Sequence, residues 1–448
     1  MTRLERALAA LTLLLTTDAI FPLIGLDPST AGVVEQTNDS GSLLKQVVFM
    51  SLYVLWGAVL LRRVGLVTVL RQVPLVWVVV GFVGASVLWS VDPTLSARRW
   101  VAFAGTATFG VYLGACWSRL QLVRLFVATG VIAIVASFLA TLVIPDLAML
   151  YDGRGVAWNG IFGHKNELGR FMAWTLFTAW LLRRASSSPR ERLLALLVAV
   201  GAAALIVLSE SKTALVVAVV MLGMVPAQRA AQTLRRQGPL LLTGVGAITG
   251  AVAVVAATLA ADNWAALTGL LGRDATLTGR TYIWKAVLES IAERPWIGYG
   301  YSAFWGGIGS PATAVWAKTG RLLDGLHVSH AHNGLLDLVL QVGIVGAAAY
   351  LVLVGATLVW SLRSLRTSGA TSEALLPLGF LVFLLIYNSI ESRTIQQNSF
   401  LWVGVCAIAT MRGLTRSAAA PARVLSPRVG SAPRPRPREM RSGTSSTS

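Results

Sequence analysis

The chain has 448 residues, of which 55% are hydrophobic and only 13% are charged, and its formal net charge is +18. Soluble domains carry about 25% charged residues, so this composition excludes an ordinary soluble protein and indicates a membrane protein. The basic residues lie in short loops and in the C-terminal tail, which is typical of membrane topology and argues against nucleic-acid binding. Cys116 and Cys406 lie far apart in apolar segments and predict neither a metal site nor a disulfide framework.

Repeated apolar runs of about 17 to 23 residues are long enough to cross a bilayer as helices. The first resembles a signal peptide but has no convincing small-residue cleavage site, so we expect it to be retained as a span. The sequence therefore predicts an all-α polytopic membrane protein of about twelve transmembrane helices. The predicted spans are residues 7–24, 44–61, 73–89, 99–116, 121–143, 167–182, 193–209, 211–226, 239–260, 331–360, 374–390 and 397–411.

Lys and Arg mark every second connection between these spans. Examples are Arg62 and Arg63 after the second span and Arg183 and Arg184 after the sixth. Because short basic loops stay in the cytoplasm, we expect a multi-pass protein of the cytoplasmic (inner) membrane with both termini in the cytoplasm. The same rule places the long polar segment between the ninth and tenth spans outside.

This pattern divides the chain into four parts. Residues 1–260 form a membrane bundle of nine spans, and residues 261–330 form a large, helical extracytoplasmic loop. Residues 331–411 return to the membrane with the last three spans. Residues 412–448 are rich in Pro, Arg and Ser without apolar periodicity, so we expect a disordered basic cytoplasmic tail.

The longest polar excursion runs from Leu277 to Asn333 and contains three of the four histidines. Arg280 opens a helical pattern, and Pro295 ends it. A guanidinium at one helix start and imidazoles at another can hold an anion and move a proton. We therefore expect an active site at the outer membrane surface. The residues that we expect on one stripe of this helix are Thr281, Trp284, Leu288 and Ile291.

Three cationic positions favour anions. His164 and Lys165 lie at the expected start of the sixth span, where backbone N–H groups attract anions; an interfacial polar cap is the alternative. Lys212 follows a tight turn with Ser211 as a possible cap, so it is either part of a phosphate site or an interface anchor. Arg280 has the bidentate fork that suits phosphate, although a salt bridge within the loop is also possible.

His330, His332 and Asn333 lie where the chain turns back into an apolar segment. Two histidines at i and i+2 do not share a helix face, and no nearby Cys or acid has metal-ligand spacing, so we expect no metal. A neutral imidazole can act as a base near pH 7. The alternative is a purely structural histidine.

Four segments together resemble the O-antigen ligase and polysaccharide polymerase superfamily of bacterial membrane proteins. Their order matches, as does the large external loop between the ninth and tenth spans, and the resemblance covers essentially the whole chain apart from the tail. The segments are GIFGHKNELG at 160–169, SESKTA at 209–214, GRTYIWKAVLESIAERPWIGYGYSAFW at 279–305 and HAHNGLLDLVLQVGIVG at 330–346.

Members of that superfamily are metal-independent, inverting glycosyltransferases that use a polyprenyl-diphosphate-linked glycan as donor. The resemblance thus implies a GT-C-like bundle without a cofactor, in which Arg280 and Lys212 grip the diphosphate and His332 is the base. The residues that it implies in support of the substrate site are His330, Asn333, His164 and Lys165.

The expected function is glycan transfer to a glycan or lipid-linked acceptor, by ligation or polymerisation of cell-surface polysaccharide. We also expect membrane lipids to contact the protein. One alternative is a permease for small solutes such as bicarbonate, and another is a non-catalytic scaffold in envelope assembly. A permease would concentrate polar residues within spans near the membrane midplane. Here the candidate residues lie at or beyond the expected outer boundary, which favours the enzyme.

Overall fold

The computed structural model describes residues 2–24, 43–151, 155–237, 280–319, 328–367, 371–390, 392 and 394–419. The predicted ninth span, 239–260, and the tail from residue 420 onward lie outside the described residues. The domain boundaries that we expect therefore remain predictions. The last helix, however, continues to Ala419, past the expected end of the last span at residue 411.

The described residues are helical apart from loops and one short hairpin, in which β1 (Met149–Tyr151) pairs with β2 (Val156–Trp158) in antiparallel fashion. In chain order the helical elements are α1 (Arg3–Leu15), η1 (Phe21–Ile24), α2 (Leu43–Val64), α3 (Leu66–Gln72), α4 (Pro74–Ala85), η3 (Ser86–Trp89), α5 (Pro93–Cys116), α6 (Arg119–Val143), α7 (Pro145–Ala148), α8 (Lys165–Ala185), α9 (Pro189–Leu208), α10 (Lys212–Gln237), α13 (Arg280–Glu293), α14 (Ala312–Lys318), α15 (Gly334–Thr367), η4 (Ser372–Leu375), α16 (Leu376–Ile390) and α17 (Phe400–Ala419).

Five of the described helices are long and apolar enough to cross a membrane, or six if the pair α3 and α4–η3, bent by 94°, is one broken span. The protein is therefore a polytopic helical membrane protein. Every other predicted span within the described residues overlaps a helix, but these helices are shorter or less apolar. For example, α5 and α8 carry Arg99 and Arg170. The five helices are Leu43–Val64, Arg119–Val143, Pro189–Leu208, Gly334–Leu365 and Ser372–Ser389.

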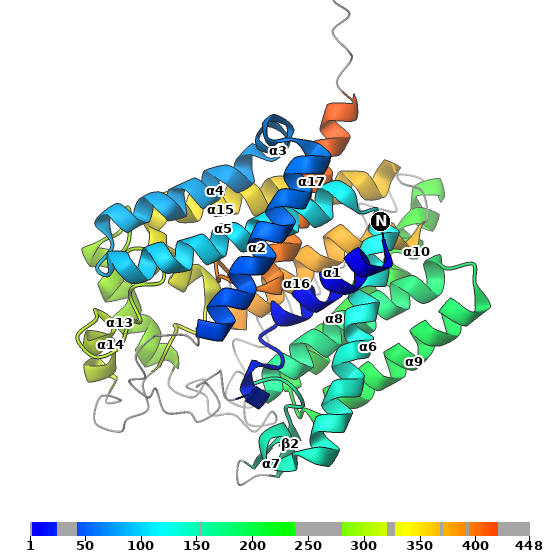
Figure 1. Ribbon diagram of the computed structural model, residues 1–448, viewed down its shortest axis with the longest axis horizontal. Coiled ribbons are helices and arrows are strands. Elements are labelled where there is room, and N and C mark those ends of the chain that lie inside the picture. Colours follow the sequence, from blue (N-terminus) through cyan, green and yellow to red (C-terminus); the bar gives the residue numbers. More distant parts are fainter. Residues whose placement is uncertain are drawn as a thin grey trace, which may run out of the picture.

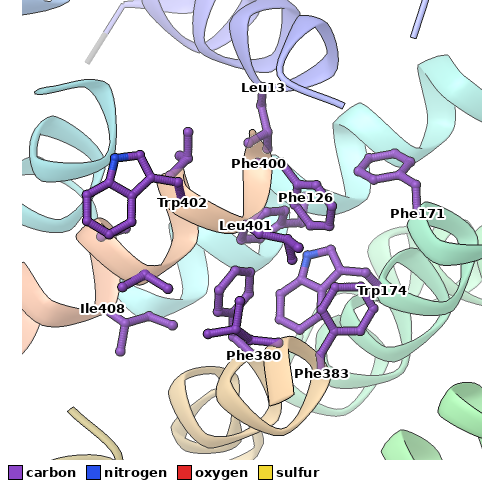
Figure 2. Packing of buried hydrophobic residues seen from close by; sticks show 14 of the residues in the cluster. Leu13, Phe126, Phe171, Trp174, Phe380, Phe383, Phe400, Leu401, Trp402 and Ile408 are labelled. Atoms are coloured by element: carbon purple, nitrogen blue, oxygen red, sulfur yellow. The ribbon is translucent and has the colours of Figure 1, made fainter. Parts of the chain in front are cut away.

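Aromatic side chains from several helices form the centre of the bundle. Figure 2 shows Trp174 of α8 surrounded by Phe126 of α6 and by Phe380 and Phe383 of α16, with ring centroids 5.1–5.4 Å apart. All four side chains are buried. Because large rings fill this space only when the helices hold a fixed spacing, the cluster fixes the position of α8 relative to α16.

Helix α17 packs closely on α5 through a GxxxG pair, Gly110 and Gly114. A Cβ atom at either position would overlap the backbone carbonyl of Val403 or Ala407. Small residues at this spacing allow two helix backbones to approach each other in a membrane. This contact holds the first turns of α17 against the C-terminal half of α5.

Helix α15 is broken at Gly343, where φ is 65° and ψ is −176°. The segment after α13 supplies hydrogen-bond partners for the backbone around the break: Ile344 N–H donates to the Pro295 carbonyl (2.8 Å) and Val345 N–H to that of Trp296 (3.2 Å). In return, Tyr299 N–H donates to the Leu340 carbonyl (3.0 Å). An interrupted helix in a membrane is stable only when such groups are satisfied. The break therefore fastens residues 294–311 to α15; this stretch between α13 and α14 is the external segment, so named because it is predicted to lie outside.

Helices α13 and α14 lie together at one end of the bundle (Figure 1) and form a second hydrophobic core with residues of the external segment. Helix α13 ends at Glu293, before Pro295, as predicted, and Arg280 is the first described residue of this stretch. The stripe singled out in the sequence is not the buried side of the helix, because Leu288 is 53% exposed and Trp284 and Ile291 are only partly buried. The helix is rotated so that another stripe meets Phe304 and Trp316. That stripe consists of Ile283, Ala286, Val287 and Ser290.

Candidate active site

A cavity of about 600 Å³ lies between α8, the start of α15, the external segment and the connection from α16 to α17. It collects residues that are far apart in the sequence, and its lining is predominantly polar. His164, His330 and His332, which we predicted as site residues, all line it. The expected outer ends of the helices thus meet at one place.

The turn His330–Ala331–His332 is held from both sides. The Ala331 carbonyl accepts a hydrogen bond from the Trp284 indole of α13 (2.8 Å), and its N–H donates to the Asp337 carboxylate (2.9 Å). His332 has a φ of 52°, a left-handed conformation that is uncommon for a residue other than glycine. Such a conformation persists where the surroundings determine it, and it is frequent at active sites.

The two imidazoles of this turn contact each other, with ring centroids 4.1 Å apart and planes at 68°. Nδ1 of His330 accepts a hydrogen bond from the His332 backbone N–H (3.2 Å). Neutral His330 therefore carries its proton on Nε2. The pair offers a donor and a base side by side on the cavity wall.

Asp337 is the buried acid that organises this wall. Its carboxylate accepts hydrogen bonds from the Trp305 indole (2.8 Å) and from Ala331 N–H, and it also contacts the Ser392 hydroxyl. It lies close enough to His332 to interact with it electrostatically. In the sequence, Asp337 is one of the acids near the histidines that lack metal-ligand spacing, and no role was predicted for it. An acid within an apolar span is nevertheless a recognisable signal of a functional site.

Asn333 has a structural role that the sequence did not predict. Its side-chain oxygen accepts hydrogen bonds from the backbone N–H groups of Leu335 (3.0 Å) and Leu336 (3.1 Å), so it caps α15. Its own N–H donates to the Ser392 hydroxyl (3.0 Å). Asn333 does not itself line the cavity. Any support that it gives to the substrate site is indirect, through the position of the preceding histidines.

The starts of α8 and α10 are tied together beside the cavity. His164 caps α8, because its Nδ1 accepts a hydrogen bond from Asn166 N–H (3.1 Å), as in the alternative of a polar cap. Ser211 caps α10 through Ala214 N–H (3.4 Å), and its hydroxyl donates to the Asn166 side-chain oxygen (3.2 Å). These contacts place the motif at 160–169 beside the motif at 209–214.

The structure does not place the three other predicted cationic residues, Lys165, Lys212 and Arg280, in the lining of the cavity. Lys165 and Lys212 do not line the cavity, although their neighbours Asn166 and Thr213 do, and Lys212 is exposed. The side chain of Arg280 lies outside the described residues. Its helix nonetheless reaches the histidine turn through the Trp284 indole.

Two arginines that the sequence analysis did not single out line the cavity. Arg99 of α5 donates from Nη1 to the backbone carbonyl and the hydroxyl of Ser302, both at 2.9 Å, and Ser302 has a φ of 58°. Arg170 of α8 is buried, with 6% of its surface exposed. Both lie inside spans predicted from hydropathy, and an ionisable residue in a span is itself a sign of function.

Fold and cavity together define a multi-pass helical membrane protein with a polar site formed at the ends of its helices. The model of the family described as O-Antigen ligase matches residues 194–351, which include Lys212, Arg280 and the histidine turn. The exopolysaccharide production protein ExoQ of Rhizobium meliloti (strain 1021) is 25% identical over 314 residues, covering 69% of this chain and 70% of the relative. The resemblance of the four motifs is confirmed: over these residues the chain is similar to the O-antigen ligase family, and over most of its length it is similar to ExoQ.

Proposed function

We propose that this protein transfers a glycan from a polyprenyl-diphosphate carrier to an acceptor, by ligation or polymerisation of cell-surface polysaccharide. The observation that carries the proposal is the fixed histidine turn on the wall of a large polar cavity. The family match, and the role in exopolysaccharide production that the name of ExoQ states, support the glycan and its lipid carrier.

In the proposed reaction an acceptor hydroxyl attacks the anomeric carbon and displaces the polyprenyl diphosphate, with inversion. One C–O bond forms to the acceptor, and the C–O bond to the diphosphate breaks. His332 takes the proton of the hydroxyl as it attacks. Negative charge accumulates on the leaving diphosphate, where Arg280 stabilises it. Lys212, which does not line the cavity, acts on this charge from the start of α10 beside the cavity. No metal or cofactor takes part in this proposal.

The topology that we propose has about twelve spans, both termini in the cytoplasm and the cavity at the outer face of the cytoplasmic membrane. Two ion pairs support it, since each joins positions predicted on the cytoplasmic side: Arg63 with Glu5 (2.9 Å) and Arg124 with Glu191 (2.7 Å). The starts of α8, α10 and α15, all predicted to face outward, gather at or beside the cavity.

Deletion of the gene is expected to cause accumulation of a polyprenyl-diphosphate-linked glycan, because its consumption would stop. Mass spectrometry of the extracted lipids, compared with the parent strain and a complemented strain, measures this. A permease instead predicts lost solute uptake with unchanged lipid-linked glycans. That second pattern would overturn the proposed function.

A further inference from the structure

The proposed mechanism leaves one buried cation of the cavity without a role. Arg170 lies in the second turn of α8, is 6% exposed and lines the cavity. Burial of a guanidinium is costly unless anions or other acceptors surround it. An anionic ligand in the cavity would therefore be attracted by the positive charge of Arg170, which the fold already holds at the cavity wall.

One partner of Arg170 within the chain is Glu167, one helical turn earlier. Nη2 of Arg170 lies 4.0 Å from Oε1 of Glu167, whereas the Arg124–Glu191 pair has two hydrogen bonds of 2.7 and 3.0 Å. A guanidinium has five N–H donors, and at 4.0 Å the contact with Glu167 is an ion pair without a hydrogen bond. Glu167 also lines the cavity, and its charge therefore acts on the same ligand with the opposite sign.

Two further features prepare Arg170 for an anion. Its guanidinium carbon lies 5.9 Å from the centroid of the Phe400 ring, which restricts the position of the group. The start of α8, where Asn166 and His164 line the cavity, adds the partial positive charge of a helix N-terminus. Both supports come from helices of the packed bundle, and preorganised charge of this kind requires little rearrangement when a ligand binds.

We infer that Arg170 is an anion-binding residue of the cavity that contacts the phosphate groups of the lipid carrier, and that Glu167 weakens this binding. The inference rests on the proposed function for the identity of the ligand. It adds a residue from inside a predicted span to the cations Arg280 and Lys212.

The test measures binding of farnesyl diphosphate, a short polyprenyl diphosphate, to the full chain in lipid nanodiscs by calorimetry. Arg170→Gln is expected to weaken binding by about tenfold to a hundredfold, as for the loss of a charge-assisted hydrogen bond. Glu167→Gln is expected to tighten binding, because it removes a negative charge beside the ligand. Arg124→Gln and Glu191→Gln form the matched control pair outside the cavity, and neither is expected to change binding.

The opposite signs distinguish ligand binding from a structural ion pair. If Arg170 and Glu167 only stabilise α8, both substitutions weaken binding or leave it unchanged, which would overturn the inference while the proposed function stands. If the unmodified protein does not bind farnesyl diphosphate, the proposed function fails together with the inference. If Arg170→Gln does not fold, Glu167→Gln decides alone: tighter binding supports the inference, and unchanged or weaker binding overturns it.

Discussion

Replacement of His332 by asparagine or alanine is expected to remove glycan transfer while leaving donor binding nearly unchanged. Loss of a positioned base lowers a rate by about 10²- to 10⁴-fold. The asparagine variant is the sharper test, because the left-handed conformation at φ 52° is tolerated by asparagine better than by alanine. If both variants are equally inactive, the missing group is the imidazole and not the backbone geometry.

Arg280→Lys provides the contrast to the His332 variants. A point ammonium does not reproduce the planar fork of arginine, so we expect donor affinity to fall by about tenfold to a hundredfold. Donor binding and glycan transfer are measured separately on purified protein. Equal loss of donor binding in the His332 and Arg280 variants would mean that His332 belongs to the carrier site or to the fold, and the proposed mechanism would be wrong.

Gly343→Ala is expected to destabilise the protein more than any substitution of a cavity residue. The backbone at φ 65° and ψ −176° is essentially restricted to glycine and costs another residue about 1–3 kcal/mol. A Cβ atom there would also overlap the backbone of Trp296 and Ile297, which adds overpacking of about 1–3 kcal/mol. The substitution separates the external segment from α15.

Gly355→Ala in the same helix is the control for this prediction. No atom lies within 4 Å of a Cβ placed at Gly355, and its φ is not positive, so stability should be unchanged or slightly higher. Thermal unfolding in detergent, followed by size-exclusion chromatography of the surviving protein, compares the two variants. Similar unfolding temperatures would show that the break in α15 does not fasten the external segment.

Hydropathy was sufficient to predict the helical bundle, because a lipid environment requires long apolar helices whatever their partners are. Pro295, a local signal, also predicted the end of α13. Hydropathy could not predict which side of α13 is buried. Phe304 and Trp316, which cover that side, come from later in the chain, and one helical pattern is compatible with more than one stripe.

The sequence motifs predicted the histidines of the cavity but not the residues that hold the histidine turn in place. Asp337, Trp284 and Trp305 fix the histidine turn through hydrogen bonds between segments that only the fold brings together. Asn333 was assigned to the substrate site from the resemblance. Its cap of α15 was not predicted, because it depends on where that helix begins. Arg170 lies inside a predicted span and directly after the motif at 160–169, so neither the loops nor the motifs singled it out.

The most direct test of the central claim is the fate of a lipid-linked glycan supplied to the purified protein in lipid vesicles. With a polyprenyl-diphosphate-linked glycan as the only donor, we expect free polyprenyl diphosphate and a glycan-bearing acceptor in equal amounts, with inverted configuration at the transferred sugar. Mass spectrometry of the lipids and NMR of the product measure both. A protein that binds this donor but releases no polyprenyl diphosphate with any glycan acceptor would contradict the account.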